Sequence, residues 1–297
     1  MKIPPGDNPL HRGIVALLFV TTFNVSSIAG DHPRGYLVAI GGGEVSSSLV
    51  ERIVGLAGGP NGKLLIVPVA SSNQLESAQY HAAEFRSHGA AEVGFALFTR
   101  ESADDDTTRS KFAGVTCVFF SGGDQSRITE ALLGTSLLKR IKEIYESGGV
   151  IAGTSAGAAA LSRVMITGNE LRNTDAERPF RSIRKGNIET TEGLGFLVDA
   201  IVDQHFVARR RHNRLISLVL EHPDLLGIGI DESTAIIFKP DGTFDVEGEN
   251  TVVIYDAVKA THAAVDEKGN LAATSIAMHV LRSGQRFDRG TRLPGVP

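Results

Sequence analysis

The sequence of 297 residues contains a single cysteine, Cys117. One thiol excludes an internal disulfide framework, and it also excludes a zinc site built from several cysteines. Because Cys117 lies in the apolar run GVTCVFF, we interpret it as a buried core thiol. The sequence also lacks an HExxH motif or a comparable group of ligands. We therefore predict neither a metal nor another cofactor.

A strong excess of charge of one sign is missing as well. The formal net charge is -4, which gives no reason to expect binding to nucleic acid or to a membrane surface. The chain shows no internal repeat and no low-complexity linker, and its length suits one large α/β domain. We therefore predict a single domain over residues 30–297.

The first thirty residues differ from the rest in composition. His11 and Arg12 precede GIVALLFVTTFNVSSIAG, an apolar stretch too short and too mixed for a membrane span. Ser27 and Ala29 supply small residues where a signal peptidase needs them. We interpret residues 1–29 as a signal peptide and expect a secreted or periplasmic protein with no stable membrane anchor after cleavage. An uncleaved anchor or a misassigned start codon is the alternative.

Apolar strands then alternate with helical segments. Five apolar runs have the continuous hydrophobic character of buried parallel strands, and each is followed by a polar or amphipathic segment. The runs are residues 35–44, 63–72, 91–98, 114–124 and 149–155. This pattern predicts an α/β fold, with a mostly parallel sheet, helices on both faces and antiparallel strands in the last fifty residues. We also expect one long helix over 126–149 and a surface loop or hairpin over 171–191.

The segment GVIAGTSAGAAALS places a serine between a strand and a small-residue helix. Residues Gly153 to Gly157 fit G-x-S-x-G, the pattern of a nucleophile elbow, which predicts Ser155 as a nucleophile. Amides at the start of the following helix, including that of Ala156, would face a developing oxyanion. The alternative is a glycine-rich turn with an idle serine.

A serine nucleophile needs a base, and His205 is the best placed of the nine histidines. It follows AIVDQ at a strand end, where α/β sites collect catalytic groups. Glu170 in MITGNE and Glu232 in GIGIDEST could each orient its imidazole. We favour Glu170 as the orienting acid and Glu232 as a pocket residue. Asp203 shares a strand face with His205 and could reach a substrate.

Two further segments could bind substrate. Arg211 and Arg214 share one face of a predicted helix and could clamp a carboxylate, although a solvated face is an equal alternative. In SGGDQ, we predict oxyanion donors at Gly123 and Asp124 and a contact from Gln125 to a substrate amide. Anion binding at a helix N-terminus is the alternative there. The triple glycine in GGGEVSSS lacks the spacing of a dinucleotide site.

Several of these segments, in this order, resemble the cyanophycinase family of serine peptidases, which are relatives of peptidase E, an aspartyl dipeptidase. The segments are AIGGGE, FFSGGDQSRI, GVIAGTSAGAAALS, DQHFVARRRHNRL and GIGIDESTA. The resemblance extends from about Tyr36 to Asp288, which is nearly the whole predicted mature chain.

The resemblance implies a fold like that of class I glutamine amidotransferases, with serine in place of the cysteine nucleophile, and it favours a homodimer. It implies hydrolysis of cyanophycin, a polyaspartate with arginine on its side-chain carboxyls, to β-aspartyl-arginine dipeptides. Ser155 is then the nucleophile and His205 the base. The family's pocket pattern falls on Gln125, Asp203, Gln204, Arg209, Arg211, Arg214 and Glu232.

A substrate with both signs of charge agrees with this pocket, because Asp203 and Glu232 could bind guanidinium groups and the arginines could bind carboxylates. The basic segment Leu171–Glu192 departs from the family pattern and could alter the substrate. A peptidase for other β-aspartyl or acidic peptides is therefore a real alternative. A non-catalytic binding protein and an esterase-like hydrolase on the same fold are further ones.

Overall fold

The computed structural model describes Met1 and residues 34–172 and 179–295. The predicted signal peptide, beyond Met1, lies outside the described residues, as does part of the basic segment, 173–178. Among the helices that are described, none is both long enough and apolar enough to cross a bilayer.

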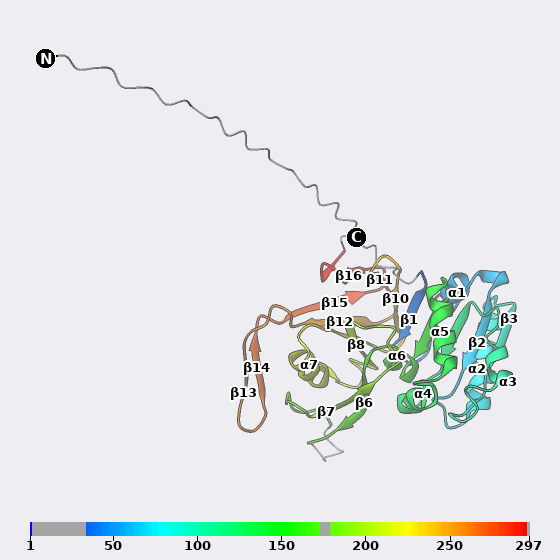
Figure 1. The fold of residues 1–297 in the computed structure, drawn as a ribbon, viewed down its shortest axis with the longest axis horizontal. Helices are drawn as coiled ribbons and strands as arrows, with labels where there is room; N and C mark the ends of the chain where they lie inside the picture. The colour runs from blue at the N-terminus through cyan, green and yellow to red at the C-terminus, as the bar shows by residue number, and fades with distance from the viewer. Residues whose placement is uncertain (2–33, 173–178, 296–297) are drawn as a thin grey trace. The chain divides into compact units, whose positions relative to one another are not determined.

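The central sheet has a parallel part and an antiparallel part (Figure 1). The parallel strands, in spatial order, are β1 (Tyr36–Ile40), β5 (Val150–Thr154), β4 (Cys117–Phe120), β2 (Lys63–Val67) and β3 (Glu92–Phe95). On the other side of β1, antiparallel strands extend the sheet: β10 (Thr234–Phe238), β11 (Thr243–Gly248), β16 (Arg286–Asp288) and β17 (Leu293–Pro294). The α/β fold with antiparallel strands from the C-terminal part of the chain is confirmed.

Helices bury apolar side chains on both faces of this sheet, because successive strand residues point to opposite faces. In β1, Val38 and Ile40 contact the core beneath α1 (Ser47–Leu56) and α2 (Gln74–Ser87). Leu37 and Ala39 contact the core on the other face. That face is covered by α4 (Gln125–Leu132), α5 (Ser136–Glu146) and α6 (Ala156–Ala160), whereas α3 (Asp106–Ser110) precedes β4.

The single long helix expected over 126–149 is wrong, because the chain forms α4 and α5 with a break between them. Gly134 has φ 76°, a left-handed conformation that interrupts the helix. The side chain of Thr135 then accepts a hydrogen bond from the amide of Leu138 and so caps α5. The apolar periodicity continues through the break, which is why the sequence reads as one helix.

A second, four-stranded sheet carries the other half of the candidate site. Its order is β15 (Ala277–Arg282), β12 (Thr251–Asp256), β9 (Leu226–Ile230) and β8 (Ala200–Gln204), with β8 and β9 parallel. One face packs into the core that α6 shares with the central sheet. The other face is covered by α7 (His212–Glu221), whose Leu215 and Leu218 lie in a third core.

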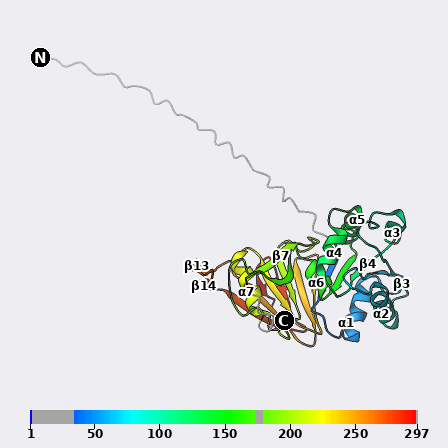
Figure 2. The ribbon, with the colours of Figure 1, turned by 90° about the horizontal axis from the view of Figure 1, so that it is seen from below.

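Two hairpins complete the described fold. Strands β6 (Val164–Glu170) and β7 (Ile188–Glu192) pair antiparallel, and β7 forms the end of the basic segment. Strands β13 (Thr261–Val265) and β14 (Leu271–Thr274) form an arm between β12 and β15, visible at one end of the four-stranded sheet in Figures 1 and 2. The arm holds the basic segment, since the amide of Leu271 donates to the carbonyl of Ile183 at 3.1 Å. A short 3-10 helix, η1 (Gly59–Asn61), precedes β2.

Candidate active site

Ser155 lies at the carboxyl end of β5, between the strand and α6. Its backbone angles are φ 51° and ψ -109°, which are strained for a residue with a side chain. Its amide donates to the carbonyl of Ile40 at 2.9 Å, so the turn is tied to the neighbouring strand β1. Gly153 and Gly157 approach so closely that a Cβ on Gly153 would lie 2.4 Å from the carbonyl carbon of Gly157. The turn therefore has the geometry of a nucleophile elbow.

His205 and Glu232 continue the arrangement from the second sheet. The hydroxyl of Ser155 lies 2.9 Å from Nε2 of His205, and Nδ1 of His205 lies 2.6 Å from Oε1 of Glu232. A carboxylate only accepts hydrogen bonds, so Nδ1 carries the proton and Nε2 is free to accept from the serine. Three side chains from two sheets thus form the chain of contacts that nucleophilic hydrolysis requires.

Glu170 does not lie beside His205, which corrects the expectation that it orients the imidazole. It ends β6, where Oε2 accepts from the amide of Phe180 and Oε1 accepts from the side-chain amide of Asn187, both at 2.7 Å. Glu232 instead reaches His205 because β8 and β9 are parallel neighbours, with Gln204 opposite Ile230. Residues that follow the two strands therefore meet at one edge.

The triple glycine after β1 is the feature that the sequence reading missed. Gly42 has φ 94°, and a Cβ on it would lie 2.3 Å from Cε1 of His205. A Cβ on Gly43 would lie 2.9 Å from Cβ of Glu232. The carbonyl of Gly41 accepts from the amide of His205 at 2.8 Å. The loop is therefore a bare backbone surface against which the imidazole and its carboxylate pack.

Asp231 is a second residue that the sequence reading did not single out. Its Oδ1 accepts from the amides of Val207 and Ala208 at 3.1 and 2.9 Å. These bonds fix the turn that leaves His205, whose own φ is 49°. Asp231 therefore stabilises the backbone turn that follows His205, whereas Glu232 contacts the imidazole directly.

The surroundings of His205 favour its neutral imidazole, the form that can accept a proton. Burial lowers the pKa of His205 below its ordinary value, the hydrogen bond to Glu232 opposes this, and the cation of Arg209 lowers the pKa further. The imidazole is therefore neutral at pH 7 and can take a proton from Ser155.

Two of the three predicted oxyanion donors remain compatible with the structure. A Cβ on Gly122 would lie 3.5 Å from Cβ of Ser155, so the SGGDQ loop borders the nucleophile. Gly123 lies in this loop with φ 139°, and Ala156 begins α6, where first-turn amides have no intrahelical acceptor. The amide of Asp124, in contrast, donates to the carbonyl of Ala70 at 3.0 Å. This bond removes Asp124 from the predicted set.

Asp203 and Arg214 form a buried pair, which corrects their expected roles as substrate contacts. Only 1% of Asp203 and 2% of Arg214 are exposed. Nε of Arg214 donates to Oδ2 of Asp203 at 2.6 Å, and Nη2 donates to Oδ1. The two charges neutralise each other inside the protein, so neither is available to a ligand in this arrangement.

The arginine run starts in a turn and not on a helix face, because α7 begins only at His212. Arg209 is exposed next to the base, and its amide donates to the carbonyl of His205 at 2.9 Å. Nη1 of Arg211 donates to the backbone carbonyl and to Oε1 of Gln204 at 2.6 and 2.7 Å. Burial, followed by the charge of Arg214, lowers the pKa of Arg211 to about 10. Arg211 is therefore still a cation at pH 7.

Gln125 uses its side-chain amide group within the protein. Nε2 donates to the carbonyls of Ile166 and Thr167 in β6 at 2.8 and 2.6 Å. The residue thus joins the start of α4 to the β6–β7 hairpin beside the site. These bonds use both amide protons, so a contact from Gln125 to a substrate amide would have to be made by Oε1 as an acceptor.

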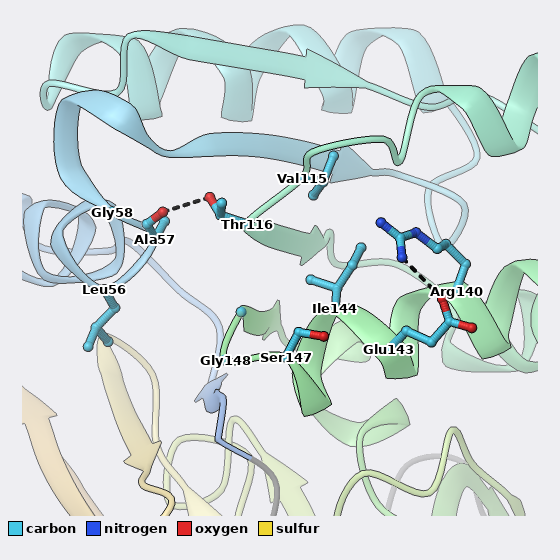
Figure 3. Close-up of a pocket in the computed structure, with 11 residues that line it drawn as sticks. Leu56, Ala57, Gly58, Val115, Thr116, Arg140, Glu143, Ile144, Ser147 and Gly148 are labelled. Atoms are coloured by element: carbon cyan, nitrogen blue, oxygen red, sulfur yellow. Dashed lines mark hydrogen bonds and ion pairs between the residues drawn. The ribbon is translucent and has the colours of Figure 1, made fainter.

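In the part of the chain that the structure describes, there is no group of three or more His, Cys, Asp or Glu side chains arranged to hold a metal ion. A cavity of about 380 Å³ lies elsewhere, between the end of α1 and α5 (Figure 3). It is lined in part by Thr116, Arg140 and Ser147, at the amino ends of β4 and β5. Ser155 is at the opposite end of β5, so this cavity is not part of the candidate site.

Comparisons with known proteins agree with this geometry. The model of peptidase family S51 matches residues 37–246. The chain is 34% identical over 266 residues to the cyanophycinase of Synechococcus elongatus, covering 87% of this chain and 80% of that protein. The cyanophycinase of Geminocystis herdmanii (strain PCC 6308) is 34% identical over 269 residues, with coverages of 88% and 96%. The crystal structure of a peptidase from an acI-B1 Actinobacterium has a TM-score of 0.64 and 25% identity, with coverages of 87% and 98%.

Proposed function

This chain belongs to peptidase family S51 and is a serine peptidase, and we propose that it hydrolyses cyanophycin to β-aspartyl-arginine dipeptides through Ser155, His205 and Glu232. The observation that carries the proposal is the chain of contacts of 2.9 Å from Ser155 to His205 and 2.6 Å from His205 to Glu232. The cyanophycinases that it resembles supply the substrate class.

The first chemical step follows from the protonation pattern. Oγ of Ser155 attacks the scissile carbonyl carbon while Nε2 of His205 takes the hydroxyl proton. Glu232 holds the imidazole in the required tautomer and stabilises the imidazolium that forms. The proton then passes from His205 to the leaving amine, and an acyl-enzyme remains on Ser155. Water, deprotonated by the same histidine, hydrolyses this ester.

The negative charge that develops on the carbonyl oxygen needs preformed donors. We assign this role to the amides of Gly123 and Ala156, which border the nucleophile from the SGGDQ loop and from the start of α6. The contribution of one such donor is about 3 kcal/mol in other hydrolases.

The charges that face the site favour a substrate carboxylate. Arg209 is exposed beside His205, and Arg211 is partly exposed, whereas Asp203 is already paired with Arg214. We assign Arg209 and Arg211 to the carboxylates of the substrate. These charged residues do not form the apolar acyl pocket that a lipase needs.

The test is release of β-aspartyl-arginine from purified cyanophycin by the wild-type chain, with Ser155→Ala alongside. Dipeptide from the wild type and none from a folded Ser155→Ala protein would support the proposal. No dipeptide from a folded wild type would refute this substrate. Other β-aspartyl and acidic peptides would then be assayed, because the basic segment beside the site favours acidic ligands. Ser155→Ala should keep its thermal midpoint within about 3 °C, since it removes one hydroxyl from a turn.

Three finer features belong to the same proposal. We infer a class I glutamine amidotransferase-like fold, supported by a nucleophile on an elbow at the carboxyl edge of a parallel sheet. We infer action outside the cytoplasm, supported by the composition of residues 1–29, and N-terminal sequencing of exported protein tests it. We also infer a homodimer, for which sedimentation velocity is the test.

A further inference from the structure

The basic segment beside the site is held firmly by side chains of other elements. We name residues 179–187 the strap. The amide of Phe180 donates to Oε2 of Glu170 at 2.7 Å, and its carbonyl accepts from Nδ2 of Asn213 at 3.0 Å. Further along, the amide of Arg184 donates to Oγ of Ser217 at 3.2 Å. Because both backbone groups of Phe180 are bonded, the residue is held in place over α7.

The strap places an aromatic ring on the buried ion pair. The ring of Phe180 lies 4.7 Å from the guanidinium carbon of Arg214. Nη1 of Arg214 is buried and has no hydrogen-bond partner in the described parts of the chain. The negative face of an aromatic ring stabilises such a cation, and it does so best where water is excluded. Phe180 therefore compensates for the bond that Arg214 lacks, and its own φ of 54° is a strain that these contacts maintain.

Asp203 links this pair to the substrate side of the site. Its Oδ1 receives Nη2 of Arg214 and also lies 3.6 Å from Nη1 of Arg211. The two arginines thus compete for one carboxylate. When Arg214 is held on Asp203, Arg211 remains available to the site, and when Arg214 is released, Asp203 attracts Arg211 more strongly.

We propose that Phe180 is a positioning residue for substrate binding, and that Glu170 is the anchor that sets Phe180 in place. The inference rests on the proposed function, because it takes Arg211 as a contact for a substrate carboxylate. It also gives a role to Glu170, whose two carboxylate oxygens each accept a hydrogen bond from the strap. A glutamine at position 170 replaces one of these two oxygens by an NH2 group, which would face a donor and not accept from it.

The test compares Phe180→Leu with Phe180→Tyr, which face the same backbone strain but differ in the aromatic face. Phe180→Leu should raise KM for cyanophycin about fivefold with a smaller change in kcat, and Phe180→Tyr should restore the wild-type KM. Glu170→Gln should raise KM in the same way. If Glu170→Gln loses as much kcat as Glu232→Gln, the proposal is overturned, because Glu170 would then take part in catalysis.

A second measurement does not depend on the substrate. Hydrogen exchange should show faster exchange at the amide of Gln204, which donates to Oδ1 of Asp203 at 2.8 Å, in Phe180→Leu but not in Phe180→Tyr. Equal exchange in the two variants would overturn the inference even if cyanophycin were not the substrate. If the wild type does not hydrolyse cyanophycin, only the proposed function is refuted. The hydrogen-exchange comparison of Phe180→Leu with Phe180→Tyr does not depend on that activity.

Discussion

Gly42 offers a sharp test of the catalytic geometry, because it lies against the base and not against the substrate. A Cβ at position 42 would be 2.3 Å from Cε1 and 2.5 Å from Nε2 of His205. Ordinary van der Waals contact begins at 3.4 Å, so the imidazole or the glycine loop must shift by about 1 Å to make room. A displacement of about 1 Å can cost roughly a hundredfold in rate. We therefore expect Gly42→Ala to lower kcat/KM for cyanophycin about a hundredfold.

Gly89 provides the matched control. Its φ is 93° against 94° for Gly42, and a Cβ there would meet nothing within 4 Å. Both alanine variants therefore place a side chain at nearly the same positive φ, at a cost of about 1 kcal/mol, which corresponds to about 3 °C in Tm. Gly89→Ala should lose that stability and keep its activity. If Gly42→Ala stays within threefold of Gly89→Ala in kcat/KM, the contact between glycine and imidazole does not position the base.

Four further predictions concern the acid, the base, its neighbouring cation and the core. Glu232→Gln should lower kcat by roughly a hundredfold or more while the fold is retained, and Glu232→Gln with near wild-type kcat would remove Glu232 from the triad. In the wild type, kcat/KM should rise with pH through a midpoint below 6.5, because burial lowers the pKa of His205 and the neutral form is the base. Arg209→Ala should move this midpoint upward, since the lost cation was one cause of the lowering, and a downward movement would contradict the assignment. Burial raises the pKa of Cys117 to about 12, so iodoacetamide should modify it only after denaturation, and rapid labelling of native protein would contradict its burial.

The positions of the proposed nucleophile and base could be predicted from local patterns. Ser155 and His205 each follow an apolar run, and the carboxyl ends of parallel strands gather catalytic groups. The orienting acid could not be chosen in this way, because both candidates lie at strand ends: Glu170 ends β6 and Glu232 comes shortly after β9. The choice depends on which strand pairs with β8, and the parallel pairing of β8 with β9 selects Glu232. Strand order is a property of the whole fold and not of either segment.

The break between α4 and α5 and the role of the triple glycine were missed for a related reason. Gly134 interrupts a segment whose apolar positions continue with helical spacing, so local pattern alone favours one helix. From the local pattern alone, the glycines after β1 invite comparison with a dinucleotide site, whose spacing they lack. Their function is to leave space for His205, a residue more than 160 positions away that belongs to another sheet.

Burial decides which of the charged residues can contact a substrate, and composition alone does not. From the sequence, three arginines and two acids near His205 suit a substrate of mixed charge. They are Arg209, Arg211, Arg214, Asp203 and Glu232. Because Arg214 and Asp203 neutralise each other inside the protein, and Oε1 of Glu232 bonds His205, the cations left to face a ligand are Arg209 and Arg211. If these two cations bind the substrate as proposed, they select carboxylates first. If cyanophycin is the substrate, its arginyl carboxylate and not its guanidinium should therefore dominate recognition, and removing that carboxylate from a model peptide should weaken binding more than replacing arginine by lysine.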